Sequence, residues 1–232
     1  MKRVAKKSDI LPDAASAPDY DPECRRCGRL ARFLDRVRDE HPRYWCRPVP
    51  PFGPRGAPLL VVGLAPGMHG ANATGRAFTG DHAGILLYET LHACGLASAP
   101  TSVSRDDDLA LVGCRISNAV KCLPPDNRPL PAEVAACRPF LAADLASLPD
   151  GAAIVALGRV AHETVLRALG LPLRAHPFAH GARHALPGGR LTMFDSFHCS
   201  RYNTNTGRLT RDMFRAVFRD ATAHLGLPPA NP

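Results

Sequence analysis

The sequence predicts a single α/β domain, in which a central, mostly parallel sheet of four strands is sandwiched between helices. Short apolar runs bounded by glycine or proline alternate along the chain with longer helical patterns, and this alternation is typical of a parallel sheet. A chain of 232 residues, 45% of them hydrophobic, fits one such domain or two small ones and can bury a full core. No apolar run is long enough to span a bilayer, so we expect no membrane partner.

The charge of the chain points to a polyanionic partner. The formal net charge is +8, and only four of the 29 basic residues are lysines, so arginine carries most of the positive charge. Guanidinium groups form paired hydrogen bonds with phosphates and stack on planar groups. Nucleic acid is therefore the simplest partner. An arginine-rich protein without such a partner would show the same balance, and charge alone does not separate the two.

The first 20 residues read as a flexible tail, basic at first and then rich in proline, alanine and aspartate. We place the folded domain at residues 21–228. The basic start lacks the apolar segment of a secretory signal, so we expect a cytoplasmic protein. In that compartment the eight cysteines are more often thiols or metal ligands than disulfides.

A CxxC pair, Cys24 and Cys27, opens the first predicted helix. The helix is amphipathic, with an apolar face formed by Leu30, Phe33, Leu34 and Val37. A redox motif of the thioredoxin kind would follow a strand, and no strand precedes this pair. We therefore interpret it as half of a metal site. The proline- and glycine-rich residues 41–57 that follow read as an irregular crossing loop.

Residues 59–64 form an unbroken apolar run that predicts the first buried strand. A glycine-rich loop follows, and then an apolar helix over residues 85–96. A strand that leads through such a loop into a helix is how α/β proteins build a ligand crevice. The loop lacks GxGxxG and GK[ST], so neither a dinucleotide site nor a P-loop is expected. Its chemistry comes from Asn72, Arg76, Phe78, Asp81 and His82.

The rest of the chain repeats this pattern. Strands are predicted at residues 111–120, 152–157 and 191–197, and helices at 132–148, 159–170 and 208–225. Between them, residues 171–190 read as a loop or a hairpin that contains His176, His180 and His184. Their spacing suits one face of a helix, but the intervening prolines and glycine argue against a helix. We expect solvated loop histidines here rather than a metal site.

The carboxyl ends of parallel strands meet at one edge of a sheet, where ligands bind. In this chain that edge would bring together the glycine loop, Asn118, Gly158 and His198. The amide of Asn118 can pair with the edge of a base, or it can cap the end of a strand. His198 precedes a polar segment that contains Arg201, which favours a role as acid or electrophile over a structural one.

Cysteine spacing predicts the second half of the metal site. Cys122 and Cys137 are separated by fourteen residues and flank a turn and a helix. With the CxxC pair they can make a four-thiolate site, and spacing does not separate zinc from an iron–sulfur cluster. Cys94 and Cys114 lie in apolar elements and are predicted to be core thiols.

Three segments together resemble the iron–sulfur uracil-DNA glycosylases, and most closely family 5, the type-B enzymes. The segments are GLAPGMHGANATGRAFTGD, SNAVKCLPPDNRPLPAEVAACRP and HCSRYNTNTGRLT. The likeness covers roughly residues 20–226, and three motifs in this order are far more specific than any one of them. It implies a DNA repair hydrolase with the glycosylase fold. Such an enzyme removes uracil, and other deaminated bases such as hypoxanthine, from double-stranded DNA and leaves an abasic site.

The resemblance also implies roles for individual residues. A structural [4Fe–4S] cluster would be held by Cys24, Cys27, Cys122 and Cys137. Asp81 and His198 match the polar pair of the active site. The base would be bound by Gly63, Ala65, Gly67, Phe78 and Asn118, with Phe78 stacking on it and Asn118 facing its edge. The segment 200–208 matches the loop that enters the duplex, with DNA contacts from Ser200, Arg201, Tyr202, Asn203 and Arg208.

Two departures from the wider family bear on mechanism. No acidic residue lies early in the first loop, because Leu64 follows Gly63 and the first acid is Asp81. This loss is typical of the type-B group and implies weaker activation of water, more reliance on stabilising the leaving base and a broader choice of bases. Cys199 stands where the third motif usually has proline, which bears on the geometry of that loop.

Two rival functions fit parts of the sequence. A non-catalytic nucleic-acid-binding module with a structural zinc needs only the basic charge and the four cysteines. A phosphate-dependent nucleoside enzyme could use the glycine loop, but the segment 200–208 would have no purpose there. Lys121 is the only lysine near the motifs, so a Schiff-base lyase is not expected. We expect a monofunctional enzyme that acts as a monomer.

Overall fold

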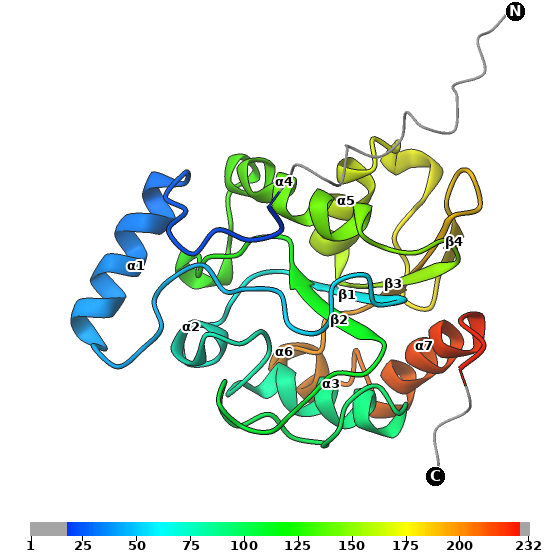
Figure 1. Ribbon diagram of the computed structural model, residues 1–232, viewed down its shortest axis with the longest axis horizontal. Coiled ribbons are helices and arrows are strands. Elements are labelled where there is room, and N and C mark those ends of the chain that lie inside the picture. Colours follow the sequence, from blue (N-terminus) through cyan, green and yellow to red (C-terminus); the bar gives the residue numbers. More distant parts are fainter. Residues whose placement is uncertain (1–17, 228–232) are drawn as a thin grey trace, which may run out of the picture.

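The computed structural model describes residues 18–227 and contains a five-stranded sheet in the order β2-β1-β3-β5-β4 (Figure 1). The strands are β1 (Leu59–Gly63), β2 (Cys114–Asn118), β3 (Ala152–Leu157), β4 (Arg183–Ala185) and β5 (Leu191–Ser196). The first, second, third and fifth of these pair in parallel, and β4 lies antiparallel to β5. The predicted mostly parallel sheet is confirmed. It has one strand more than the four predicted, because three residues are too few to show a period.

Seven α-helices lie within the described residues: α1 (Gly28–Glu40), α2 (Ala71–Thr74), α3 (His82–Ala93), α4 (Pro131–Ala146), α5 (Arg159–Ala168), α6 (Arg201–Asn205) and α7 (Arg211–His224). Two short 3-10 turns are η1 (Pro125–Asn127) and η2 (Leu173–Ala175). Every helix that the sequence predicts is present, with ends shifted by up to three residues. The single-turn helices α2 and α6 were not predicted, because one turn is too short for a helical period.

Helices cover both faces of the sheet, as predicted. Helices α3 and α7 cover one face, and α4 and α5 cover the other (Figure 1). The side chains of Leu59 and Val61 pack with the first pair, and those of Leu60 and Val62 pack with the second. This alternation follows from the two-residue period of a strand. Because both faces are covered, all five residues of β1 are buried and apolar or glycine.

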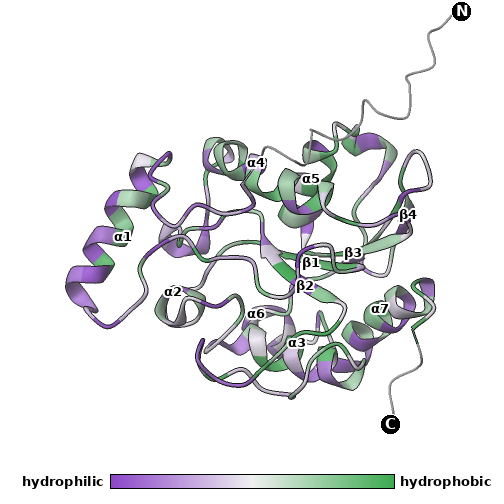
Figure 2. Ribbon diagram, in the orientation of Figure 1, coloured by the Kyte–Doolittle hydropathy of each residue, from purple (hydrophilic) through white to green (hydrophobic). Residues whose placement is uncertain are grey.

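Helix α1 lies at the side of this sandwich and is mostly hydrophilic (Figure 2). Its buried stripe, Leu30, Leu34 and Val37, confirms the predicted amphipathic face. Leu30 packs against Val120 and the helix α4, so the stripe fixes α1 beside the segment that leaves β2. The CxxC pair at its start is thereby brought to the same place as the cysteines further along the chain.

Contacts at the start of the described residues begin just before the predicted domain boundary at residue 21. The carboxylate of Asp19 lies 2.6 Å from the guanidinium of Arg115, and the hydroxyl of Tyr20 donates to the carbonyl of Pro48 at 2.9 Å. The remainder of the predicted tail, and residue 228 at the other boundary, lie outside the described residues. Within the described part of the chain, no helix combines the length and apolarity needed to cross a membrane.

Candidate active site and four-cysteine cluster

The candidate active site is a cavity of about 1050 Å³ at the carboxyl ends of the parallel strands. Its walls come from the segments that follow β1, β2 and β5 and from the start of α3. Eight of the predicted site residues line it: Ala65, Gly67, Phe78, Asp81, Asn118, His198, Ser200 and Arg201. The prediction that this edge of the sheet gathers the glycine loop, the amide and the histidine therefore agrees with the structure.

Gly63 does not line the cavity, but the cavity can form only because this residue has no side chain. It ends β1 and is paired in the sheet with Asn118. A Cβ atom at this position would lie 2.4 Å from Oδ1 of Asn118 and 2.6 Å from Cζ of Phe78. Both distances are shorter than any tolerated contact, so only glycine lets the amide and the ring reach the same part of the cavity.

Phe78 is held in an uncommon backbone conformation. Its φ is 55°, in the left-handed region that a bulky residue rarely adopts, and its side chain is buried. The carbonyl group of Phe78 packs on Gly84, where a Cβ would lie 1.8 Å from the carbonyl oxygen. The ring lies 6.0 Å from that of His198, centroid to centroid, with 27° between the planes. Both residues line the cavity, and their rings form its aromatic wall. Phe78 is in a strained conformation, and functional residues concentrate at such positions.

Asn118 carries a polar atom without a partner. The side chain is 4% exposed, and its Oδ1 accepts no hydrogen bond from the described residues. A buried acceptor left unpaired costs about 1–3 kcal/mol. Native structures rarely keep such a group, and it marks a position where a ligand donor completes the pairing.

Asp81 caps the helix α3. Its Oδ1 accepts the N–H of Gly84 at 2.9 Å. Its Oδ2 lies along the glycine loop, where a Cβ on Gly70 would come within 2.5 Å of it. Burial raises the pKa of Asp81 above its usual value, while the N–H groups of Gly84 and Ala83 oppose that rise. The cap therefore fixes one oxygen of the carboxylate and directs the other along the loop that lines the cavity.

His198 follows β5 and is held through its backbone. Its carbonyl oxygen accepts a hydrogen bond of 2.8 Å from Nδ2 of Asn203. Burial lowers the pKa of His198 from 6.5 to about 4, so the ring is neutral at neutral pH. A neutral imidazole offers one donor and one acceptor. The ring can therefore donate a hydrogen bond into the cavity without carrying a charge.

The predicted DNA-contacting loop, residues 200–208, is largely helical, which corrects the sequence-based interpretation. Ser200 caps α6 by accepting the N–H of Asn203 at 3.4 Å. A serine at this position is a common helix start, and this signal was present in the sequence. The hydroxyl of Thr204 lies 3.0 Å from Nε2 of His82, which joins α6 to the start of α3.

The predicted DNA-contacting residues divide into two groups. Ser200 and Arg201 line the cavity, whereas Tyr202, Asn203 and Arg208 do not. The side chain of Tyr202 is 71% exposed, the largest apolar exposure on α6. The guanidinium of Arg208 lies 4.5 Å above the ring of Phe197. The segment therefore presents an exposed aromatic and a basic group beside the cavity.

Four cysteines from three segments meet in one place, as their spacing predicts. Cys24, Cys27, Cys122 and Cys137 surround a cavity of about 20 Å³ beside Leu30. Burial raises the pKa of Cys27 to about 11 and also raises those of Cys122 and Cys137, and neighbouring thiols add to each shift. Ionising these thiols requires a compensating cation, so the cluster is a candidate metal site.

The other cysteines are buried thiols. All eight cysteines of the chain are free. Cys94 and Cys114 lie in the apolar core against α3, which confirms the prediction of core thiols. Cys199 is also fully buried in that core, and burial raises its pKa. A thiol at this position thus fills a packed apolar site next to His198.

A buried ionic network beneath the cavity was not predicted. The ammonium of Lys121 contacts the hydroxyl of Ser117 and lies 3.4 Å from a carboxylate oxygen of Asp144. The guanidinium of Arg115 pairs with the same carboxylate at 2.9 Å. No sequence signal could have shown this, because Asp144 lies near the end of α4, more than 20 residues further along the chain. The network directs Lys121, the only lysine among the described residues, away from the cavity.

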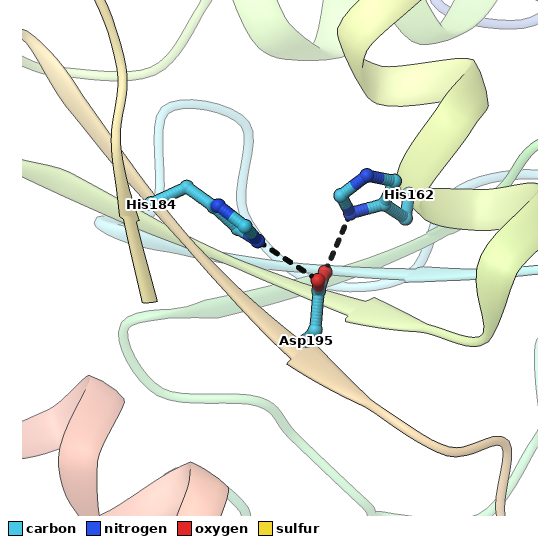
Figure 3. Close-up of side chains that lie close together, drawn as sticks. All are labelled: His162, His184 and Asp195. Carbon is cyan, nitrogen blue, oxygen red and sulfur yellow. Dashed lines mark hydrogen bonds and ion pairs between the residues drawn. The ribbon is translucent and has the colours of Figure 1, made fainter. Parts of the chain in front are cut away.

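The prediction of solvated loop histidines is wrong for His184. This residue lies on β4, and its Nε2 is 2.9 Å from the buried carboxylate of Asp195. His162, on α5, contacts the other oxygen of that carboxylate at 2.7 Å (Figure 3). The loop interpretation failed because the short strand β4, which pairs with β5, brings His184 over the sheet.

Comparisons with known proteins indicate the family of the chain. The model of the Uracil DNA glycosylase superfamily matches residues 50–222. A type-5 uracil-DNA glycosylase of Thermus thermophilus is 48% identical over 211 residues, 88% of this chain and 94% of the relative. A type-5 uracil-DNA glycosylase of Pyrobaculum aerophilum is 44% identical over 88% of this chain and 89% of its own length. A type-4 uracil-DNA glycosylase of Thermotoga maritima aligns over only 44% of this chain and 46% of its own.

Proposed function

The chain belongs to the uracil DNA glycosylase superfamily, within its type-5 group, and from this premise we propose that it excises uracil from double-stranded DNA. The enzyme hydrolyses the N-glycosidic bond of a nucleotide flipped out of the duplex and leaves an abasic site. Other deaminated bases, such as hypoxanthine, are further substrates. It acts as a monomer, and its eight free thiols support a cytoplasmic location.

The unpaired amide of Asn118 is the observation that carries this proposal. Uracil presents an N–H beside a carbonyl oxygen on its pairing edge, and an amide offers the complementary acceptor and donor. Asn118 lines the cavity, and its buried Oδ1 has no partner among the described residues. A flipped base would complete this hydrogen bond. A site built to pair a specific N–H discriminates strongly against ligands that lack it.

The aromatic wall supports base flipping. Extrusion of a nucleotide from a duplex costs a few kcal/mol. Stacking of the base on an aromatic ring returns about 1–3 kcal/mol. The ring of Phe78 is held at the cavity by its own backbone conformation and by the absence of a side chain at Gly63. This pre-arranged position means that little conformational entropy is lost when a base binds.

The same groups accommodate hypoxanthine. This purine also presents an N–H beside a carbonyl oxygen, so it offers Asn118 the same pair of groups as uracil. The cavity of about 1050 Å³ exceeds the volume of either base. Adenine and cytosine carry an amino group and an unprotonated ring nitrogen at these positions. Deamination of either base therefore creates the pattern that the amide recognises.

Asp81 and His198 stabilise opposite charges during bond cleavage. Breaking the N-glycosidic bond builds positive charge on the sugar and negative charge on the departing base. The carboxylate of Asp81 favours the cationic sugar and orients water with the oxygen that does not cap α3. The neutral ring of His198 donates a hydrogen bond to the base as its charge develops. Fixed groups aimed at developing charge give the largest catalytic effects.

The reaction stops at the abasic site. Strand cleavage by a Schiff base needs an amine that reaches the sugar carbon. The amine of Lys121 is buried and contacts Ser117 and Asp144 instead. No other lysine lies among residues 18–227. We therefore propose a monofunctional glycosylase.

The segment of α6 forms the DNA-facing edge of the site. Arg201 lies at the cavity and can hold a phosphate next to the flipped nucleotide. The exposed ring of Tyr202 is placed to occupy or flank the gap that the flipped base leaves in the duplex. Ser200 and Asn203 hold this short helix in position through its cap.

We propose that the four cysteines hold a [4Fe–4S] cluster in a structural role. A single zinc ion at about 2.3 Å from each sulfur would bring the sulfurs to about 3.8 Å from one another. No three of these sulfurs lie within 4.8 Å of one another, a spacing that suits a larger group. The N–H of Lys121 donates to Sγ of Cys137 at 3.2 Å, as hydrogen bonds to cluster ligands do. When bound, the cluster links α1, α4 and the segment after β2.

A glycosylase assay tests the proposed function. The purified protein is incubated with end-labelled duplexes that differ only in one base, which is uracil, hypoxanthine or cytosine. We expect strand cleavage at uracil and at hypoxanthine after alkali, no cleavage at cytosine, and intact strands before alkali. Binding to the uracil duplex without any alkali-labile product would contradict the proposal and support a non-catalytic binding module. Iron and sulfide in the protein would support the cluster, and zinc alone would contradict it.

A further inference from the structure

A second group of potential metal ligands lies apart from both sites described above. His162 on α5, His184 on β4 and Asp195 on β5 converge from three elements (Figure 3). One donor atom from each lies within 4.8 Å of the other two. Asp195 and His162 are almost completely buried, and none of the three lines the base cavity. We propose that these three side chains bind a divalent transition-metal ion, with Zn²⁺ as the best match.

The hydrogen-bond partners of His162 require an additional proton or a cation at this place. Its Nδ1 lies 2.7 Å from a carboxylate oxygen of Asp195, and its Nε2 lies 2.9 Å from the carbonyl oxygen of His176. Both partners are acceptors when the carboxylate is ionised, but a neutral imidazole has only one N–H to donate. Either an additional proton or a cation must therefore lie between His162 and Asp195. A metal ion fulfils this need and is held by the same atoms.

The hydrogen bond between His162 and the carbonyl of His176 is of a kind found at metal sites. An imidazole that binds a metal through one nitrogen usually donates its other N–H to a carboxylate or a backbone carbonyl, which fixes the ring. The carbonyl of His176 accepts such a bond from Nε2 of His162, which leaves Nδ1 facing Asp195. The ring of Phe178 packs edge-on against the same imidazole, with 5.5 Å between centroids, and limits access of water.

The set of donors suits zinc. Two imidazole nitrogens and one carboxylate oxygen are common zinc ligands, and metal–ligand bonds of about 2.0–2.1 Å place them about 3.3–3.5 Å apart. The present contacts of 2.7 and 2.9 Å are made to different oxygens of Asp195 and would have to widen by about half an ångström, so that the carboxylate faces the ion with both oxygens. The ring of His176 lies 5.7 Å from that of His184 and is partly exposed. It can supply a fourth ligand by rotation, or water can take that place.

A bound metal ion would link the segment between α5 and β4 to the end of β5 that leads to His198. The backbone N–H of Asp195 donates to the carbonyl of Ala182, and that of Gly181 donates to the carbonyl of Asp195. A metal ion would add a bond across α5, β4 and β5 at the same point. His198 lies three residues beyond Asp195. The ion would thus stabilise the loop that carries His198, without contacting the substrate.

Equilibrium dialysis of the iron-loaded protein against zinc tests this inference. Zinc and iron are measured together in the wild type, in His184→Gln and in a control, His92→Gln, whose side chain is exposed on α3. We expect one zinc per chain in the wild type and the control, none in His184→Gln, and unchanged iron in all three. Equal zinc in all three proteins would overturn the inference. A gain of zinc matched by a loss of iron would also overturn it, because the ion would then be at the cysteines.

Two further measurements test the inference even if the His184→Gln variant does not fold. Circular dichroism checks that His184→Gln is folded. In addition, Co²⁺ is added to the wild type alone, and its absorption is recorded as a difference spectrum. We expect the intense visible bands of cobalt in a four-coordinate nitrogen–oxygen site, displaced by one equivalent of zinc. Weak bands of hexaaqua cobalt alone would overturn the inference even if the variant does not fold.

Discussion

The base cavity and the four-cysteine cluster both lie at the end of β2, yet they are built in opposite ways. Asn118, the last residue of β2, lines an open space of about 1050 Å³ and carries a buried, unpaired oxygen. Cys122, four residues later, faces a closed space of about 20 Å³ among buried apolar side chains. The cavity contains an unpaired oxygen, on Asn118, and a strained backbone, at Phe78, whereas the four cysteines come from three segments that pack tightly together. One strand end thus supports a site for recognition and a site for stability.

This difference predicts how substitutions at the two sites should behave. Groups held unpaired in the cavity cost stability and are retained for function, so their removal should affect turnover more than folding. The cysteines connect α1 to α4, so their removal should affect folding first.

Asp81→Asn should reduce turnover on uracil duplex by about 10²–10³-fold while leaving stability nearly unchanged. Asparagine is as good a helix cap as aspartate, so the bond to the N–H of Gly84 survives and only the charge is lost. Single-turnover assays and thermal unfolding are the measurements. Asp81→Ala is the matched variant, and it should lose the same activity and about 1 kcal/mol of stability as well. Full activity in Asp81→Asn would show that the carboxylate charge takes no part in catalysis.

Cys137→Ser should lose its iron and several kcal/mol of unfolding free energy, because metal binding contributes directly to folding. Iron content and chemical denaturation are the measurements. Cys94→Ala provides the control, since Cys94 is a buried thiol in the core rather than in the cluster. This control should keep its iron and lose only about 1 kcal/mol. Iron retained in Cys137→Ser would show that Cys137 is not a ligand.

Asn118→Ala should slow uracil excision by about 10–100-fold, because one hydrogen bond to a buried group is worth about 1–3 kcal/mol. Its stability should stay equal to that of the wild type or rise slightly, since the substitution removes an unpaired buried oxygen. Activity and melting temperature are measured on the same preparation. A large loss of stability with unchanged activity would contradict the view that Asn118 serves recognition rather than folding.

The pH dependence of stability should report the buried state of His198. Its folded pKa of about 4 lies below the usual 6.5, so the unfolded chain binds the proton more readily between these values. The stability that the neutral ring contributes is therefore present above pH 6.5 and is lost as the pH falls toward 4. Denaturation of the wild type and of His198→Gln should diverge by roughly 1–2 kcal/mol, less than the full shift implies because the ring faces the open cavity. Parallel curves would show that the ring is not desolvated.

The sequence predicted the sheet and the base cavity well for a physical reason. Long apolar runs such as residues 59–64 have one stable place in an α/β fold, which is the centre of the sheet. Once the parallel strands are assigned, their carboxyl ends must meet, which brings Asn118 and His198 together. The cysteines were paired by similar reasoning, because two thiol pairs that lie far apart in the chain suggest one shared site.

What the sequence did not reveal depends on contacts between distant side chains. The strand β4 has three residues and exists only because β5 offers it an edge. His184 therefore read as a loop residue, although pairing places it over the carboxylate of Asp195. The network of Lys121 with Asp144 and the conformation of Phe78 are likewise products of tertiary packing. None of these features leaves a periodic pattern.

The most direct test of the account is whether uracil leaves the duplex and enters the cavity. The slow variant Asp81→Asn is bound to a duplex that carries 2-aminopurine opposite a single uracil, and fluorescence is recorded at saturation. Base flipping predicts a rise in fluorescence, because the flipped uracil leaves its partner unstacked and unpaired, and no rise when cytosine replaces uracil. Saturated binding, shown by anisotropy, without any rise at the uracil duplex would contradict it.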